Sequence, residues 1–195
     1  DDFPRAVEIH EERLCFAGTS RNPSTIWLSQ TNNWDNFRSV SNLDTDPLSY
    51  TLASDDGEPI SWLISRSDLM IGMGSSEWSF GSRDNSQALT SSIVHAASQS
   101  DDGVEYIMPA KAGGMVIFVR RGNRELASIS YDFANDGYNA VSLCTMNPDI
   151  LEGGVVSIFN QLSPTNKIYC VLKSGKIAVF TYDKENNVAA WGSFI

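Results

Sequence analysis

Asn166–Phe194 has the sequence NKIYCVLKSGKIAVFTYDKENNVAAWGSF, and it sets the architecture that we expect for the whole chain. Its first two apolar runs are rich in the β-branched and aromatic residues that suit a pleated, half-buried surface. They are joined by Lys173-Ser174-Gly175-Lys176, whose glycine supplies the positive φ of a tight turn. This pattern predicts a β-hairpin, and a second polar turn at Asp183–Asn187 leads to a third strand at Val188–Trp191.

The same layout of short apolar runs and polar turns recurs three more times upstream. In the first run, Ala6, Glu8 and His10 alternate with Val7 and Ile9, which is the period-two pattern of a strand with one wet face. The runs expected as strands are Pro4–Glu11, Arg13–Gly18, Thr25–Ser29 and Leu48–Ser54 in the first repeat, Pro59–Ser65, Asp68–Met73, Glu77–Gly81 and Ile93–Ser98 in the second, Val104–Pro109, Met115–Arg120 and Glu125–Tyr131 in the third, and Val155–Phe159 with the hairpin in the fourth.

The spacing of the repeats identifies the architecture. Equivalent positions in the second strands are separated by 55, 47 and 52 residues; they are Leu14, Leu69, Val116 and Ile168. Periods of about 40 to 50 residues with a few short strands each are typical of propeller blades. A regular β-sandwich is the alternative. Against it, a polar turn with glycine opens repeats two to four, at Gly57, Gly103 and Gly153-Gly154.

We therefore expect an all-β, β-propeller-like fold with about four blades of three to four antiparallel strands, as a single domain over residues 1–195. The chain starts at Asp1 and holds about four repeats, so we expect an incomplete propeller excised from a longer chain. One helical turn is expected at Asn147–Leu151, with Asn147 as N-cap and Pro148 at the first helical position. The predicted core comprises Leu14, Phe16, Trp62, Leu69, Ile71, Val116, Phe118, Ile168, Val171 and Val179.

Composition excludes several classes of protein. The chain is 42% hydrophobic, too apolar for disorder, and it has no apolar run near the roughly 20 residues of a membrane-spanning helix. Its net charge of −10 and pI near 4.5 disfavour tight binding to nucleic acid phosphates. Three dispersed cysteines, Cys15, Cys144 and Cys170, suggest buried thiols, and no glycosylation sequon is present. These features favour folding in a reducing cytosol.

No motif for catalysis stands out. The two histidines, His10 and His95, are not at metal-ligand spacing. The loop Asn42-x-Asp44-x-Asp46 starts like a calcium site, but Pro47 occupies the position of the required glycine. Ser54–Gly57 is similar to the Asp-box of sialidases, although its spacing is one residue short. We therefore expect no catalytic residue, no cofactor and no metal.

Three passages together resemble the propeller region of the tail nozzle, or tail tubular, proteins of short-tailed bacteriophages and related prophages. These passages are Pro4–Phe37, Trp62–Phe80 and Arg124–Leu143, and Val188–Trp191 matches the strand that often closes this region. The resemblance covers essentially the whole chain. The residues that carry it are packing and turn residues, which propellers in general can share.

The resemblance implies a structural protein of the virion tail, made in the bacterial cytoplasm, without enzymatic activity. Its partners would be other tail, adaptor or fibre proteins, the full-length protein would assemble as a ring, and ejected DNA would pass nearby without specific binding. No membrane insertion is expected. The alternative function is a carbohydrate-binding or carbohydrate-acting propeller, in which exposed tryptophans serve as sugar platforms; the candidates are Trp27, Trp34, Trp62 and Trp78.

Overall fold

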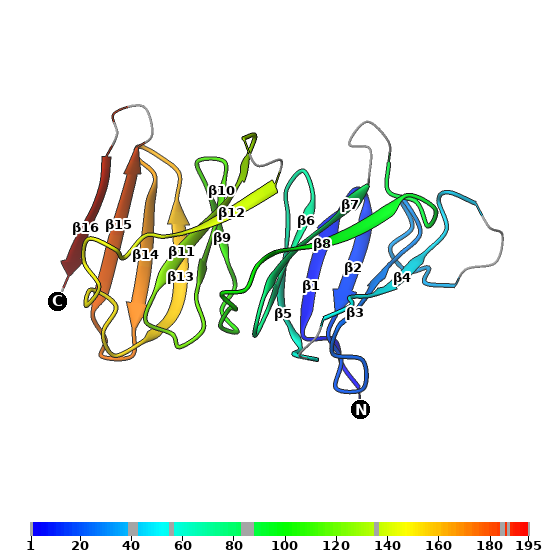
Figure 1. Cartoon of the computed structure of the whole chain (residues 1–195), viewed down its shortest axis with the longest axis horizontal. Coiled ribbons are helices and arrows are strands. Elements are labelled where there is room, and N and C mark those ends of the chain that lie inside the picture. The colour runs from blue at the N-terminus through cyan, green and yellow to red at the C-terminus, as the bar shows by residue number, and fades with distance from the viewer. Residues whose placement is uncertain are drawn as a thin grey trace. The chain divides into compact units, whose positions relative to one another are not determined.

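The computed structural model describes residues 2–38, 43–54, 57–82, 88–134, 137–183, 186 and 188–194. Over these ranges the fold is all-β and propeller-like, as the repeat predicted, with sixteen strands in four antiparallel sheets of four (Figure 1). The chain divides into two compact units, Asp1–Gly103 and Val104–Ile195, and each unit contains two sheets. We call each sheet a blade. The described residues form no helix, and therefore none that is long and apolar enough to cross a membrane.

Each blade is a meander in which consecutive strands pair. The strands of the first unit are β1 (Ala6–His10), β2 (Arg13–Ala17), β3 (Thr25–Leu28) and β4 (Leu48–Thr51) in the first blade, and β5 (Ile60–Ser65), β6 (Leu69–Met73), β7 (Glu77–Ser82) and β8 (Val94–Ser100) in the second. Those of the second unit are β9 (Ala110–Ala112), β10 (Met115–Val119), β11 (Leu126–Asp132) and β12 (Gly137–Ser142) in the third blade, and β13 (Val155–Gln161), β14 (Lys167–Leu172), β15 (Ile177–Asp183) and β16 (Val188–Phe194) in the fourth.

The turns follow the predicted glycine pattern. Gly175, at the tip of the β14–β15 hairpin, has a φ of 85°, and Gly103, at the end of the second blade, has a φ of 74°. Both values lie in the left-handed region that glycine adopts without steric cost. A side chain at Gly103 would also collide with the backbone carbonyl of Gly74.

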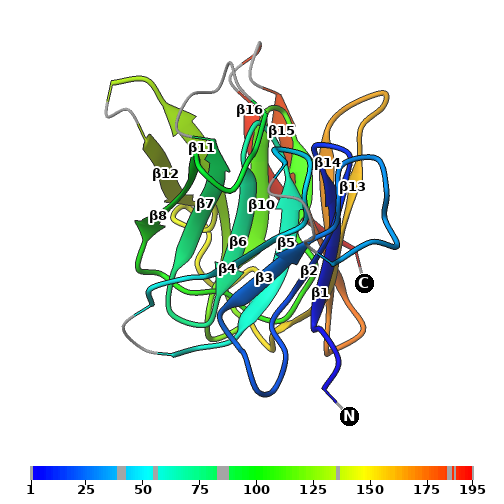
Figure 2. The ribbon, with the colours of Figure 1, turned by 90° about the vertical axis from the view of Figure 1, so that its right-hand side faces the viewer.

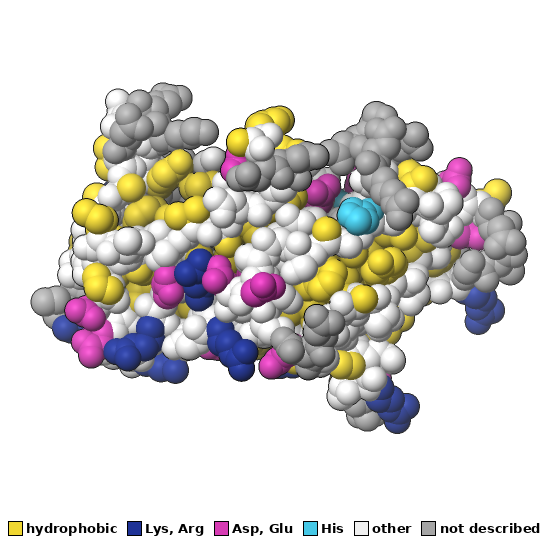
Figure 3. Space-filling model, in the orientation of Figure 1, with side chains coloured by type: hydrophobic (Ala, Val, Ile, Leu, Met, Phe, Trp, Pro, Cys, Tyr) yellow, Lys and Arg dark blue, Asp and Glu magenta, His cyan; other side chains and the backbone are white. Residues whose placement is uncertain are grey.

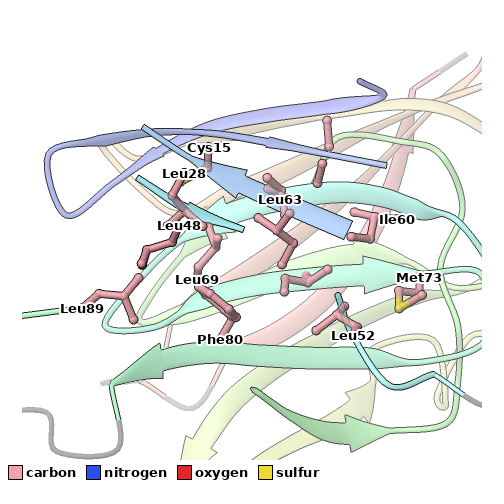
Figure 4. Close-up of a cluster of buried hydrophobic side chains, with 14 residues drawn as sticks. Cys15, Leu28, Leu48, Leu52, Ile60, Leu63, Leu69, Met73, Phe80 and Leu89 are labelled. Atoms are coloured by element: carbon pink, nitrogen blue, oxygen red, sulfur yellow. The ribbon is translucent and has the colours of Figure 1, made fainter. Parts of the chain in front are cut away.

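The core of the first unit lies between its two blades. Figure 2 shows the β1–β4 sheet lying across the β5–β8 sheet, with β1 and β2 packed against β5. Cys15, Leu28 and Leu48 of the first blade point toward Leu63 and Phe80 of the second (Figure 4). Because alternate residues of a strand face one side of its sheet, each blade contributes every second residue to this core.

The second unit is built in the same way. The buried side chains of β9, β10 and β11 pack against those of β13, β14 and β15. Trp191 of β16 lies 5.1 Å from Phe180, ring centroid to ring centroid, and its indole nitrogen donates to the carbonyl of Leu143 at 2.8 Å. The last strand is therefore tied to the chain segment that leaves the third blade.

Most of the predicted core is confirmed. Seven of its members are buried: Trp62, Leu69, Ile71, Val116, Phe118, Ile168 and Val179. The prediction was wrong for Leu14, Phe16 and Val171, which are only half-buried. Their strands bury the opposite face, which in β2 carries Arg13 and Cys15. Both faces of these strands carry apolar residues, so alternation did not reveal which face is buried.

Three local predictions also need correction. The first strand of the third blade is β9, not Val104–Pro109. In that segment only Val104 forms a β-bridge, an isolated one to Arg120. The strand β12 was not predicted. Asn147–Leu151 is not helical, because the backbone bonds here join residues three apart, such as Ile150 to Asn147. A segment this short has too few bonds to offset the cost of starting a helix.

Candidate functional site

Two open hollows flank the connection between β12 and β13 at one end of the second unit. The first has a volume of about 500 Å³ and is lined by Arg124, Glu125, Ser142, Cys144, Thr145, Pro148 and Asp149. The second has a volume of about 390 Å³ and is lined by Asn147, Asp149, Ile150, Glu152, Gly153, Leu172, Ser174, Lys176, Ile177, Ala178 and Ser193. Since Asp149 lines both, the connection forms a ridge between them.

Two neighbouring hairpin tips hold this ridge in place. The backbone N–H of Val155 donates to both the backbone and side-chain oxygens of Asn123, at 3.1 and 2.9 Å, which joins the ridge to the β10–β11 turn. The N–H of Lys173 donates to the carbonyl of Gly154 at 2.9 Å, which joins it to the β14–β15 turn. Leu151 is fully buried and anchors the ridge from below.

The rim of the first hollow carries paired charges. Arg120 and Glu125 form an ion pair at 3.0 Å, and Arg124 and Glu152 form a more exposed pair at 3.4 Å. Figure 3 shows basic and acidic side chains lying close together along the lower edge of the part that carries β9–β16. Arg120, Arg121 and Arg124 form the densest basic cluster of the sequence. Because Arg120 and Arg124 already contact carboxylates, this cluster is poorly suited to bind a phosphate group.

The thiol in the first hollow is not an activated nucleophile. Burial raises the pKa of Cys144, and the thiolate is the form that attacks. Burial likewise raises the pKa of Cys15 and of Cys170 to about 12. All three cysteines are free and buried, as predicted.

The histidines and acidic loops also lack the arrangement of a metal site. His10 is buried and its Nδ1 lies 2.9 Å from the hydroxyl of Ser65, while His95 is exposed on β8. Among the described residues no group of three or more His, Cys, Asp or Glu side chains is placed to hold a metal. Asp55 and Asp56, of the Asp-box-like sequence, lie outside the described residues.

The calcium-like loop instead surrounds an arginine that the sequence analysis missed. The guanidinium of Arg13 donates to the carbonyls of Asp46 at 2.7 Å and Ser29 at 2.8 Å, and to those of Asp44 at 3.0 Å and Leu89 at 3.3 Å. These four carbonyl oxygens therefore already accept hydrogen bonds from a cationic side chain. Arg13 is only 2% exposed, and burial lowers its pKa from the ordinary value. Asn42, the first residue of the loop motif, lies outside the described residues.

The tryptophans do not form a common platform. Trp62 is buried against Gly72, where a side chain would collide with the indole ring. Trp78 is half-buried on the core of the first unit, and its Nε1 donates to the hydroxyl of Ser76 at 2.8 Å. Trp34 is 50% exposed, and its Nε1 donates to the carbonyl of Glu12 at 3.2 Å. Core packing explains the positions of Trp62 and Trp78, and the hydrogen bond to Glu12 holds Trp34 in its turn.

No protein-family model and no curated protein matches the chain. Two solved structures that match are a chain of the Saccharomyces cerevisiae complex of Dbp5 bound to Nup159, Gle1, IP6 and ADP, and the N-terminal domain of Nup159, a β-propeller. Their TM-scores are 0.54 and 0.53, with 8% and 9% identity over 98% of this chain. The likeness is one of fold. This chain spans less than half of either matched chain, 44% and 45%.

Proposed function

We propose that the chain is a structural part of a bacteriophage tail, within the nozzle that continues the portal and adaptor channel. It acts through packing and protein contacts without catalysis, and it is made in the bacterial cytoplasm before assembly into the virion. Its partners are other tail, adaptor or fibre proteins, and the full-length protein forms a ring.

The observation that carries this proposal is the position of the passages that resemble tail nozzle proteins. Pro4–Phe37 contains β1 to β3, Trp62–Phe80 contains most of β5 to β7, and Arg124–Leu143 contains β11 and β12. The resemblance therefore falls on whole blade hairpins with the turns that join them. A resemblance distributed in this way concerns the blade scaffold and not an isolated motif.

The electrostatics of the chain suit a wall beside moving DNA. The net charge of −10 repels phosphate, and two arginines of the densest basic cluster are paired with Glu125 and Glu152. Strong phosphate contacts would act as a brake on a genome that slides past. A chain in which 24 acidic residues outnumber 14 basic ones provides a passage with weak phosphate contacts.

An antibody raised against the purified chain and coupled to gold tests the proposal by electron microscopy of particles from cells that carry the gene. We expect label on the tails, and deletion of the gene should leave DNA-filled heads that are not infectious. Complementation with the wild-type gene and with Met146→Ser, at a 94% exposed position, should restore infectivity equally. Normal tails after deletion, or label confined to structures other than the tail, would overturn the proposal.

A further inference from the structure

In the described part of the chain, the outer strand of the third blade has one edge without a partner strand. β12 stands at the end of its sheet, beside β11, and no described strand pairs with its other side (Figure 2). The backbone N–H of Leu143 donates to the carbonyl of Leu126 at 2.9 Å, so Leu143 faces β11. Because hydrogen-bonded and non-hydrogen-bonded pairs alternate in an antiparallel ladder, the backbone N–H and C=O groups of Ala140 and Ser142 point away from β11, toward the open edge.

This edge has none of the features that normally prevent the addition of another strand. The sequence of β12, Gly137–Ser142, contains no charged residue and no proline, and its ladder with β11 runs without a bulge. Natural proteins protect edge strands with charges, prolines or bulges. The outer strand of the second blade, β8, has such protection, since its register shifts beside Trp78. The edge of β12 is therefore suited to accept an added strand.

One end of this edge lies beside exposed aromatic rings. Tyr131 and Tyr138 are cross-strand partners whose ring centroids are 5.5 Å apart, and the ring of Phe133 lies 5.0 Å from that of Tyr131. Phe133 is 90% exposed and Tyr131 is 41% exposed. We call these three residues the aromatic cluster. Because alternate residues of a strand share a face, Tyr138, Ala140 and Ser142 lie on the same side of β12. A strand added to the edge would place a side chain against the aromatic cluster.

The other end of the edge opens into the first hollow. Ser142 lines this hollow together with Asp149. The side chain of Asp149 is exposed and forms no ion pair with any described residue, whereas Arg124 in the same hollow is paired with Glu152. Asp149 is therefore a carboxylate that can attract a cation, and the net charge of −10 on the chain favours the same sign of ligand.

The aromatic end favours a cation too, because lysine and arginine are attracted to the face of an aromatic ring. In an extended segment paired antiparallel with β12, the residues opposite Tyr138 and Ser142 are four positions apart and share one face. A basic residue at each position would contact the aromatic cluster and approach Asp149. A second copy of β12 would instead bring another Asp149 and another net charge of −10, so charge disfavours self-association at this edge.

We propose that β12 is the docking strand for an extended, basic segment of a partner protein, which adds to the third blade as a fifth, antiparallel strand. The main chain of the partner pairs with Ala140 and Ser142, and two basic side chains four residues apart contact the aromatic cluster and Asp149. In recognition by strand addition, main-chain hydrogen bonds supply affinity and alternate side chains supply specificity. This inference does not rest on the proposed role in a phage tail.

Fluorescence anisotropy with a labelled synthetic heptapeptide, Thr-Arg-Thr-Val-Thr-Arg-Thr, tests the proposal. Its two arginines and its central valine share one face and match the spacing of Tyr138, Ala140 and Ser142. We expect saturable binding to the purified chain at peptide concentrations below about 1 mM. N-methylation of the valine blocks the hydrogen bond to Ala140 and should weaken binding at least about tenfold. Glutamate in place of both arginines should abolish binding.

Variants of the chain locate the site. Ala140→Pro removes one outward N–H, and because edge strands tolerate proline, circular dichroism should be unchanged while binding weakens about tenfold. Asp149→Asn should weaken binding about threefold. Val156→Thr, at a 54% exposed position of the fourth blade, is the control and should bind like wild type. Amide chemical shifts on peptide addition should change most in β12.

Absence of saturable binding, equal binding of the N-methylated peptide, or shifts centred away from β12 and the first hollow would overturn the proposal. Should Ala140→Pro fail to fold, the N-methylated peptide with the wild-type chain decides the result. A dimer in sedimentation velocity that Ala140→Pro dissociates would also overturn it, because the edge would then pair with a second copy. These outcomes leave the tail proposal standing, since that proposal is tested on the particle.

Discussion

Replacing Arg13 with alanine should strongly destabilise the first unit. This guanidinium is 2% exposed and donates to four backbone carbonyls from three separate segments. A hydrogen bond from a charged donor contributes about 1.5 to 3 kcal/mol. Counting only its two short buried bonds, to Ser29 and Asp46 at 2.8 and 2.7 Å, the expected loss is about 3 to 6 kcal/mol. Such a loss approaches the whole stability of a small domain.

The effect should depend on the shape of the donor as well as its charge. Arg13→Lys keeps a cation but loses the planar fork that reaches several carbonyls at once, so we expect a destabilisation between those of wild type and Arg13→Ala. Arg124→Ala is the matched control. It removes an ion pair whose two side chains are 63% and 71% exposed, and should cost less than about 1 kcal/mol.

Urea unfolding with hydrogen exchange, followed by mass spectrometry, measures this prediction and locates it. Protection should be lost first in β2, β3 and the segment 43–51, and should persist in β9–β16. If Arg13→Ala and Arg124→Ala unfold at the same urea concentration, or if protection falls equally in both units, the reasoning about this buried cation is refuted.

Three further predictions concern binding, chemistry and pH. A mobility-shift titration with double-stranded DNA at about 0.15 M salt should show at most non-specific binding, at or weaker than about 10⁻⁴ to 10⁻⁶ M; submicromolar binding that survives higher salt would contradict the charge argument. No reducing sugar should be released from capsular or lipopolysaccharide substrates, and release that Asp55→Asn or Asp56→Asn abolishes would establish a glycosidase instead. Burial raises the pKa of Cys15 and Cys170 from 9.0 to about 12, because it disfavours the charged thiolate. The contribution of these two neutral thiols to the free energy of unfolding is therefore fully present below pH 9 and is lost as pH rises from 9 to 12. Urea unfolding should therefore show stability falling over that window, by about 1.4 kcal/mol per pH unit for each thiol, and Cys15→Ala or Cys170→Ala should flatten the fall; an equal slope in wild type and variants would contradict it.

The blade pattern was predictable because it is local. The hairpin at Lys173–Lys176, and the turns at Gly57 and Gly103, follow from residues adjacent in sequence, and both turn glycines have positive φ. The strand β9 was not predictable in the same way. It has three residues, too few for periodicity to show, and it is defined by pairing with β10.

The buried faces and the Arg13 site could not be predicted because they depend on distant residues. In β2 the apolar Leu14 and Phe16 alternate with Arg13, Cys15 and Ala17, and a periodicity argument favours burying the larger side chains. The structure instead buries Arg13, Cys15 and Ala17. The guanidinium of Arg13 donates hydrogen bonds to the backbone carbonyls of residues 29, 44, 46 and 89. Only a basic residue within an otherwise apolar strand hinted at this, and its partners are not identifiable without the fold.

Cryo-electron microscopy of the tail of a particle made from the genome that encodes this chain tests the proposed function most directly. The account predicts tail density into which the four-stranded blades β1–β4 and β13–β16 fit with their registers intact. A tail fully explained by other chains, with no density for these blades, would contradict it.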